Sequence, residues 1–268
     1  MSTEIWTQDV IFIIKQIMQI LTEKQFIECH NKHTQLRINQ LYNECFTFVD
    51  KICKDRDSSH GLMHMVKVTY NGLNILFNKL CTNNIVTYFD VEDIIIGCML
   101  HDVADHKYET SDDALIIQVK DFIDYLFKNK FATGFSSSNE MLLIIKHISF
   151  SLEKKKGGRQ ELIKSFPNST PLRIYTIRDI ISDADRLEAI GENGAKRCIE
   201  YTQYKWPTKN IAFIKKEIHK HAQEKLFILP FGDPDTNQPY FHTPFGKSMA
   251  LKLHSDTLKY INQFLESS

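Results

Sequence analysis

Apolar residues recur along this chain at steps of three and four, which is the spacing of an amphipathic α-helix. Five stripes of this kind run over Val10–Leu21, Met63–Leu80, Leu115–Leu126, Ile174–Ala184 and Ala250–Ile261. Glycine and proline are scarce, with 10 and 7 among 268 residues, and this disfavours an all-β fold full of tight turns. The pattern therefore predicts an all-α protein.

The boundaries of several helices are also marked. Ser137–Glu140 has the Ser-Ser-Asn-Glu pattern of a capping box, and Ser111–Asp113 offers a cap and two acids for a first turn. Lys154–Arg159 is interpreted as an exposed loop, and Pro207 and Pro230–Pro244 mark irregular stretches. No linker separates two cores. We therefore expect one domain over residues 41–268, preceded by an N-terminal helical extension over residues 1–40.

Charge and apolar content exclude some classes of partner. Lys+Arg and Asp+Glu number 33 each, so a broad basic field for duplex nucleic acid is not expected, although a local basic pocket is possible. The stretch Val10–Leu21 is too short and, with Lys15, too polar to span a bilayer. Glu4 and Asp9 stand where a signal peptide would carry positive charge. No membrane partner is therefore expected.

The six cysteines are scattered and form no Cys-x-x-Cys pair. They are Cys29, Cys45, Cys53, Cys81, Cys98 and Cys198. In a chain of this size they indicate reduced core thiols, and a disulfide framework is the weaker interpretation. We expect a cytoplasmic protein.

Polar residues interrupt the apolar pattern at three places. His64 follows Met63, a stripe residue, and therefore lies about 100° to one side of the stripe. The apolar run Ile94–Leu100 leads directly into His101 and Asp102. Asp185 follows Ala184, so it too lies at the flank of a stripe.

Each interruption has a structural explanation of its own: a hydrogen-bonded half-buried histidine, a helix end that has reached solvent, or a salt bridge from Asp185 to Arg186. Together they favour convergence, because a buried imidazole or carboxylate needs a partner. Two histidines and two aspartates suit Mn, Fe, Co, Ni or Zn, whereas Mg prefers an all-oxygen shell. We predict one divalent transition-metal ion held by His64, His101, Asp102 and Asp185.

This pattern resembles the signature of HD-domain metal-dependent phosphohydrolases. Residues 57–68 (DSSHGLMHMVKV) are similar to that family's DSS-(G)-HDWWHI-x-RV segment, and residues 100–108 (LHDVADHKY) to LHDIGDSKF. Residues 182–197 (SDADRLEAIGENGAKR) resemble QDADRLDAIGAIGIAR, and residues 221–226 (HAQEKL) resemble HFYEKL. The resemblance covers roughly residues 44–265 and implies an HD-domain helical bundle. Gly61 replaces the family's usual acid, and Leu62 and Met63 replace its paired aromatics.

The resemblance also implies roles for individual residues. His64, His101, Asp102 and Asp185 match the metal ligands. Asp105 matches the acid that lies beside the nucleophilic water. Lys107 is near enough in sequence to hold a phosphate oxygen, and Lys225 is a weaker candidate of the same kind.

Three further residues have alternatives. Arg186 can clamp a phosphate bidentately, or pair with Glu188 or a helix end. His60 is expected to line the pocket or contact substrate. His147 is a core or pocket histidine, or, together with His106, a ligand to a second ion.

The resemblance implies metal-dependent hydrolysis of a phosphoester or phosphoanhydride, with a small-molecule nucleotide as substrate and (d)NTP pyrophosphohydrolase as one form of the reaction. One rival is a binuclear phosphodiesterase, or even diiron oxygen chemistry. Another is a non-catalytic HD module that senses a nucleotide. The helix at Val10–Leu21 can cap the core, serve a partner or form a dimer contact.

Overall fold

The computed structural model describes residues 12–13, 15–17, 19, 32–56, 61–78, 88–104, 114–133 and 138–267. Across these residues there are helices and no strand, which confirms the all-α class. The helices are α3 (Lys32–Cys53), α4 (Leu62–Asn78), α5 (Tyr88–Leu100), α6 (Ala114–Lys128), α7 (Ser138–Lys146), α8 (Phe150–Lys156), α9 (Arg159–Ile163), α10 (Leu172–Glu188), α11 (Gly191–Lys205), α12 (Ile211–His221), the π-helical turn η2 (Ala222–Leu226) and α13 (Pro244–Glu266). No helix among the described residues is long and apolar enough to cross a membrane.

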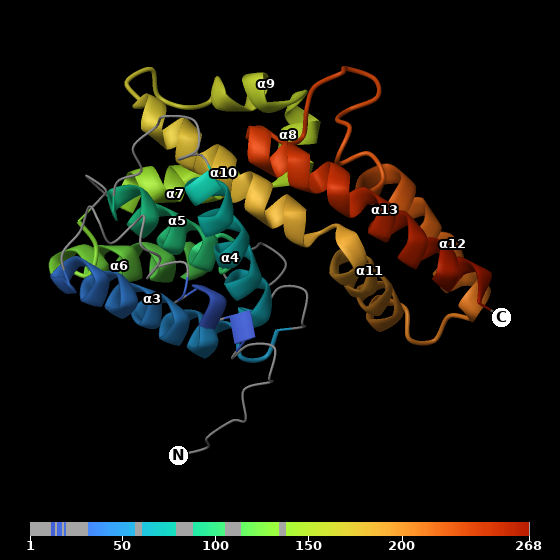
Figure 1. Ribbon diagram of the computed structural model, residues 1–268, viewed down its shortest axis with the longest axis horizontal. Helices are drawn as coiled ribbons and strands as arrows, with labels where there is room; N and C mark the ends of the chain where they lie inside the picture. The colour runs from blue at the N-terminus through green and yellow to red at the C-terminus, as the bar shows by residue number, and fades with distance from the viewer. Residues whose placement is uncertain are drawn as a thin grey trace, which may run out of the picture.

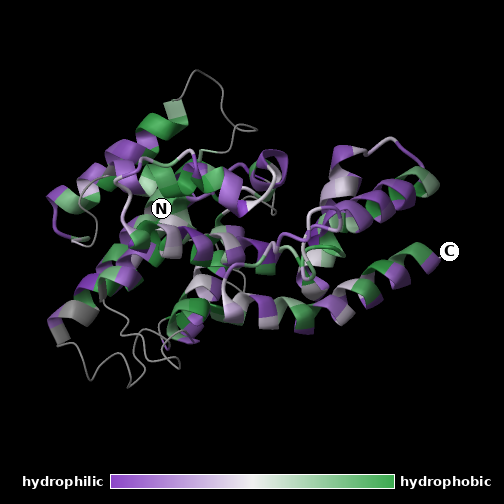
Figure 2. Ribbon diagram, turned by 90° about the horizontal axis from the view of Figure 1, so that it is seen from above, coloured by the Kyte–Doolittle hydropathy of each residue, from purple (hydrophilic) through white to green (hydrophobic). Residues whose placement is uncertain are grey.

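The helices form a larger and a smaller part, which lie side by side in Figure 1. The larger part packs α3, α4, α5, α6, α7 and α10 around the main hydrophobic core. The smaller part packs α11, α12, η2 and α13 around a second cluster of buried residues, among them Ile199, Ile218 and Ile261. In Figure 2 the helix that ends at the C-terminus alternates hydrophobic and hydrophilic positions along its length.

The second cluster was not expected, because the sequence has no linker between the two parts. Only Ala189 and Ile190 separate α10 from α11, and both are buried. The boundary expected between residues 40 and 41 falls inside α3.

The apolar stripes mark the helices well. Four of them fall in α4, α6, α10 and α13, and α7 begins at Ser138, inside the capping-box segment. Of the stripe Val10–Leu21, the described positions are helical and Ile17 is buried. Four free cysteines are described, of which Cys45, Cys53 and Cys98 are buried, in agreement with the prediction of core thiols.

The exposed loop expected over Lys154–Arg159 is wrong. The three lysines form the last turn of α8, and Gly157, with φ of 88°, ends that helix in the left-handed conformation. Lysines are favourable at a helix C-terminus, because the backbone carbonyls there are partly negative, and glycine adopts positive φ without strain. Arg159 already belongs to α9 and pairs with Asp179.

Helices α4, α5 and α10 approach one another closely, and glycine permits this. A Cβ atom at Gly97 on α5 would lie 2.2 Å from Cδ1 of Ile181 on α10. A Cβ atom at Gly72 on α4 would lie 2.7 Å from Sγ of Cys98 on α5. This packing brings the first part of α4, the end of α5 and the last turns of α10 together.

Candidate metal centre

Three side chains from three helical segments converge where α4, α5 and α10 meet. His64 lies near the start of α4, His101 directly follows α5, and Asp185 lies in the last turn of α10. The Nε2 atoms of the two histidines are 3.1 Å apart. Oδ1 of Asp185 is 3.4 Å from Nε2 of His64 and 3.7 Å from Nε2 of His101. These three ligand atoms all lie within 4.8 Å of one another, so they can hold one metal ion.

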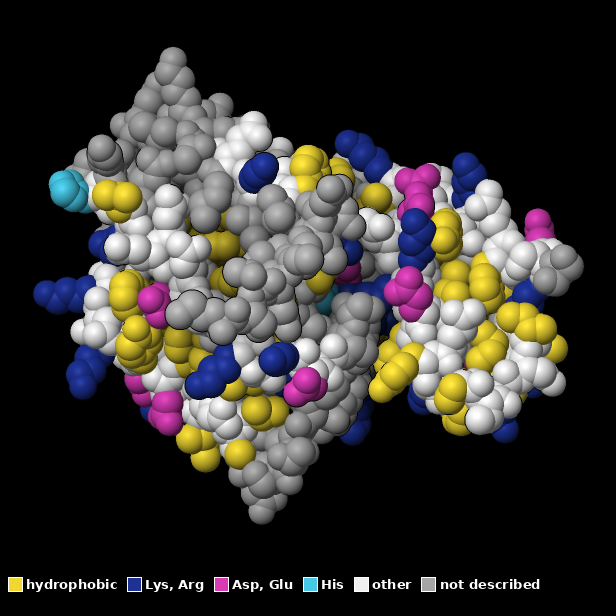
Figure 3. Space-filling view, turned by 90° about the horizontal axis from the view of Figure 1, so that it is seen from below, with side chains coloured by type: hydrophobic (Ala, Val, Ile, Leu, Met, Phe, Trp, Pro, Cys, Tyr) yellow, Lys and Arg dark blue, Asp and Glu magenta, His cyan; other side chains and the backbone are white. Residues whose placement is uncertain are grey.

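Asp102 lies beside this group. Its carboxylate oxygens are 3.6 Å from Nε2 of His64 and 3.9 Å from Nε2 of His101. Both histidine side chains are 2% exposed, whereas those of Asp102 and Asp185 are 24% and 27% exposed. The carboxylates therefore lie on the open side of the group. In Figure 3 a histidine is visible beside acidic and basic side chains in a notch between the two parts of the molecule.

Contacts at the Nδ1 atoms orient both imidazole rings so that their Nε2 atoms face each other. Nδ1 of His101 lies 2.8 Å from the carbonyl oxygen of Cys98, to which it donates. Nδ1 of His64 lies 3.2 Å from Oε2 of Glu188 and 2.7 Å from Nη1 of Arg197. Both rings are held at their Nδ1 edges, so that the two Nε2 atoms face the same point. This arrangement is characteristic of histidines that ligate metals.

Glu188 is shared between His64 and two cations. The Arg197 guanidinium on α11 pairs with the Glu188 carboxylate and lies 2.7 Å from Nδ1 of His64. Nζ of Lys67 lies 3.8 Å from the other Glu188 oxygen. Glu188 thus lies at the centre of this set and, together with Arg197, holds the Nδ1 edge of the His64 ring.

Arg56 holds the turn that carries His101 and Asp102. Its guanidinium donates to the carbonyl oxygen of Asp102 at 2.7 Å and to that of Val103 at 2.5 Å. These carbonyls follow the end of α5, where backbone oxygens lack helical partners. Arg56 therefore fixes the backbone of one candidate ligand.

The group is electrostatically prepared for a cation. Burial and the neighbouring Arg197 lower the pKa of His64 to about 4. Burial opposes protonation of His101 as well, but Asp102 and Asp185 raise the pKa of His101 to about 9. Burial would raise the pKa of Asp185, but its hydrogen bonds with His101 and His64 hold that pKa well below its usual value.

The donor set decides which metals fit. Two neutral imidazoles with one or two carboxylates suit Mn, Fe, Co, Ni or Zn, and they suit Mg less because Mg takes oxygen ligands. The Nε2 lone pairs, the ionised Asp185 and the orienting hydrogen bonds all fit a divalent transition metal.

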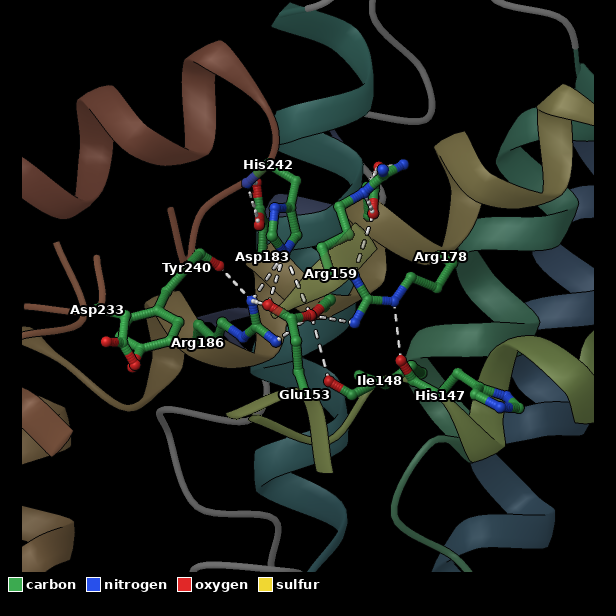
Figure 4. A network of polar contacts seen from close by, with 12 residues as sticks. His147, Ile148, Glu153, Arg159, Arg178, Asp183, Arg186, Asp233, Tyr240 and His242 are labelled. Carbon is green, nitrogen blue, oxygen red and sulfur yellow. Dashed lines mark hydrogen bonds and ion pairs between the residues drawn. The ribbon is translucent and has the colours of Figure 1, made fainter. Parts of the chain in front are cut away.

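Other residues predicted from the sequence do not join this group. Arg186 lies on the same helix as Asp185 but is buried in an ion-pair network on another face of α10 (Figure 4). Its Nη2 donates to Oε2 of Glu153 at 3.0 Å, and its Nη1 donates to the carbonyl oxygen of Tyr240. The sequence offered Glu188 as an alternative partner for Arg186. In the structure the partner is Glu153. Its guanidinium is thus committed to holding α8 and the segment before α13 onto α10.

His147 and Lys225 also lie in other surroundings. Nδ1 of His147 donates to the carbonyl oxygen of Leu143 at 2.7 Å, and its Nε2 lies 3.1 Å from Oγ of Ser165. Nζ of Lys225 lies over the ring of Phe150, 5.5 Å from its centre. His60, Asp105 and Lys107, like His106, lie outside the described residues.

Glu188, Arg197, Lys67 and Arg56 were not predicted as site residues. Glu188 had a local signal, because it follows Asp185 by three positions and so lies on the same helix face one turn on. Arg56 and Arg197 act through contacts with residues on other helices, for which a single sequence carries no signal.

Comparisons with known proteins identify the fold. No protein-family model and no curated protein matches the sequence. YpgQ of Bacillus subtilis, solved in complex with ADP, is similar with a TM-score of 0.52 at 17% identity, over 85% of this chain and 94% of that chain. A Lactobacillus plantarum protein is similar with a TM-score of 0.55 at 21% identity, over 84% of this chain and 95% of that chain. The likeness shows that this chain shares the all-helical fold of these two proteins.

Proposed function

We propose that this protein is a metal-dependent phosphohydrolase that acts on nucleotides, of the HD subgroup that the sequence motifs resemble. The observation that carries the proposal is the convergence of His64, His101 and Asp185, with both imidazoles held by their Nδ1 atoms so that Nε2 faces the group. Structural histidine–aspartate contacts do not need this shared orientation, whereas metal ligation does.

His64, His101, Asp102 and Asp185 would hold one divalent ion. Two imidazoles and two carboxylates leave open positions on a six-coordinate ion for a water and a substrate oxygen. When bound, the ion supplies Lewis-acid polarisation of a phosphoryl oxygen and lowers the pKa of a water. Asp102 and Asp185 are partly exposed, so a substrate would approach the ion from their side of the group.

The chain's other residues would move the proton and balance the phosphate charge. Asp105, four residues after His101, takes the proton of the attacking water. The water oxygen forms a bond to phosphorus, the bond from phosphorus to the leaving oxygen breaks, and that oxygen leaves with a proton or as an anion. Lys107 offsets charge on the transferring oxygens, which is where most catalysis of phosphoryl transfer lies. Lys67 and Arg197 add positive charge beside His64.

The nucleotide substrate is supported by a fold neighbour, because YpgQ was crystallised with ADP. We propose a nucleoside triphosphate hydrolysed with pyrophosphate release. The free buried thiols fit a reducing compartment, so we propose a cytoplasmic location.

A single ion is favoured over a pair. His147 and His106 were the candidates for a second site; both ring nitrogens of His147 are engaged by Leu143 and Ser165, and His106 lies outside the described residues. The non-catalytic sensor remains the rival to test, and Asp105→Ala separates it from an enzyme: a sensor keeps its ligand and has no turnover to lose.

The test is release of phosphate and pyrophosphate from deoxynucleoside and nucleoside triphosphates, monophosphates and cyclic dinucleotides, with Mn, Co, Ni, Mg or EDTA. Asp102→Ala is the test variant and Asp124→Ala, an exposed aspartate on α6, is its matched control. We expect the wild type to release pyrophosphate. EDTA and the Asp102→Ala substitution should abolish this release, whereas the Asp124→Ala variant should keep it. Release that is indifferent to EDTA, or no turnover by a metal-loaded protein, contradicts the proposal.

A further inference from the structure

A cavity of about 610 Å³ lies between the N-terminal helix, α4, the α10–α11 junction and α13. Its size falls in the range of small-molecule pockets, which is about 300–1,000 Å³. We propose that this pocket binds the nucleoside part of the nucleotide, with Phe12, Ile13 and Gln16 of the N-terminal helix as one wall. The inference rests on the proposed function and names its substrate subsite.

The pocket begins one side chain away from the metal-binding group. Glu188 lines the pocket and also accepts the hydrogen bond from Nδ1 of His64. Lys67 lines it too, and lies one helical turn after His64 on α4. The four candidate ligands do not line the pocket, so Lys67 and Glu188 are its connection to the metal group. We infer that a nucleotide with its phosphates at the metal group extends past these two side chains and places its sugar and base in the pocket.

The lining suits a flat heterocycle with hydrogen-bonding edges. Three amide side chains, Gln16, Asn71 and Asn193, come from three different elements. Each amide offers both donors and an acceptor, as the edge of a nucleobase requires. Phe12 and Tyr70 add aromatic rings, on which bases stack.

The charges of the lining orient the ligand. Glu188, Glu192 and Asp256 contribute three carboxylates, against the single cation of Lys67. Glu188 is paired with Arg197 and Lys67, and Glu192 with Lys196, so the lining offers no unpaired cluster of cations to a phosphate and suits the uncharged nucleoside better. The anionic end of the ligand therefore belongs at the metal group, and the neutral end belongs in the pocket.

The proposal also gives the N-terminal extension a role. Ile17 of that helix is fully buried, so the helix is anchored to the larger core. Gln16 precedes Ile17 and faces the pocket. The extension then determines substrate affinity, besides covering the core.

The test compares two ligands of the metal-loaded protein by calorimetry: a non-hydrolysable nucleoside triphosphate, and inorganic tripolyphosphate, which has no nucleoside. The test variants are Asn71→Ala and Gln16→Ala. Loss of one or two hydrogen bonds to the nucleoside should raise the Kd for the nucleotide about tenfold, which corresponds to about 1.4 kcal/mol. The Kd for tripolyphosphate should stay within about twofold.

Each variant has a matched control. Asn74 lies on α4 three residues after Asn71; it is half-buried and donates to a backbone carbonyl at 3.0 Å, much as Asn71 donates to the Ala184 carbonyl at 3.2 Å. Asn74 does not line the pocket, so Asn74→Ala should leave both constants unchanged. Lys15→Ala, at an exposed position beside Gln16, is the control for the N-terminal wall.

Two results overturn the inference. One is an unchanged nucleotide Kd in both pocket variants, and the other is an equal loss of affinity for nucleotide and tripolyphosphate. Either can occur while metal-dependent nucleotide hydrolysis persists, so it leaves the proposed function standing. Failure of the wild-type protein to bind any nucleotide contradicts both the pocket inference and the proposed function.

Discussion

Glu188 and His64 stand 124 residues apart in the sequence, and Oε2 of Glu188 lies 3.2 Å from Nδ1 of His64. This contact joins the end of α10 to the start of α4. It holds the Nδ1 edge of the His64 ring, so that Nε2 faces Asp185. A carboxylate behind a histidine ligand raises the basicity of that ligand and fixes its ring.

Replacement of Glu188 should weaken metal binding without loss of the fold. Glu188→Gln removes the charge that lies beside Nδ1 of His64 and pairs with Arg197 and Lys67, so the His64 ring is held less firmly. We expect the metal Kd to rise by about 10–100-fold, measured by competition with a chelator. Glu200→Gln, at an exposed glutamate on α11, is the control and should bind metal as the wild type does. Unchanged metal affinity in Glu188→Gln would show that His64 is oriented by other contacts.

Arg56 should be needed for a well-formed His101–Asp102 turn. Arg56→Ala removes two hydrogen bonds from a charged donor, each worth about 1.5–3 kcal/mol. We expect a lower unfolding temperature and weaker metal binding together, measured by thermal unfolding with and without Mn. Lys54→Ala, at an exposed position two residues earlier, should change neither. A variant that is destabilised but binds metal normally would restrict Arg56 to a structural role.

The buried ion pairs around Glu153, which lie outside the candidate metal centre, should contribute strongly to the free energy of unfolding. Glu153 lies between Arg178 and Arg186, and all three side chains are fully buried. Glu153→Ala leaves two guanidinium groups without their carboxylate, which should cost about 3–5 kcal/mol in the free energy of unfolding. Urea denaturation measures this. Glu161→Ala, which breaks an exposed pair with Lys164, should cost less than about 1 kcal/mol. A similar loss of unfolding free energy in Glu153→Ala and Glu161→Ala would contradict the role given to the buried ion pairs.

The same carboxylate should make stability depend on acid pH. Burial alone would raise the pKa of Glu153, but the hydrogen bond with His242 and the charges of Arg186 and Arg178 hold it far below the ordinary 4.5. A lowered pKa means that the unfolded chain takes up the proton first. The stabilisation is therefore complete above pH 4.5 and is lost as the pH falls further.

Urea denaturation between pH 7 and pH 3 tests this dependence. The difference in unfolding free energy between wild type and Glu153→Gln should be largest near pH 7 and shrink below pH 4.5. A difference that stays constant over this range would mean that Glu153 does not titrate differently in the two states.

The sequence predicts the helices better than it predicts their assembly. Apolar periodicity is a local property, so it places α4, α6, α10 and α13 without knowledge of their neighbours. It does not show that Arg178, Asp183 and Arg186 are buried, because charged residues in a helix normally indicate a solvent-exposed face. Their burial depends on partners such as Glu153 and His242, which lie on other elements.

The candidate metal ligands could be predicted from the sequence because they too leave a local signal. His64, His101, Asp102 and Asp185 each interrupt an apolar stretch, and an isolated buried polar group is costly unless it has a partner. For Arg186 the resemblance offered two alternatives, a phosphate clamp or a pairing with Glu188 or a helix end. On a helix, adjacent residues point about 100° apart, and this rotation turns Arg186 to the Glu153 network.

The most direct test of the account is a measurement of bound divalent metal and of nucleoside triphosphate hydrolysis on the same preparations of wild type and Asp185→Asn. Asp235→Asn, at an exposed position before α13, is the control. We predict one ion per chain and metal-dependent pyrophosphate release for the wild type and the control, with both lost in a folded Asp185→Asn. A wild-type protein that binds no ion, or an Asp185→Asn variant that hydrolyses nucleotides as well as the wild type, would contradict it.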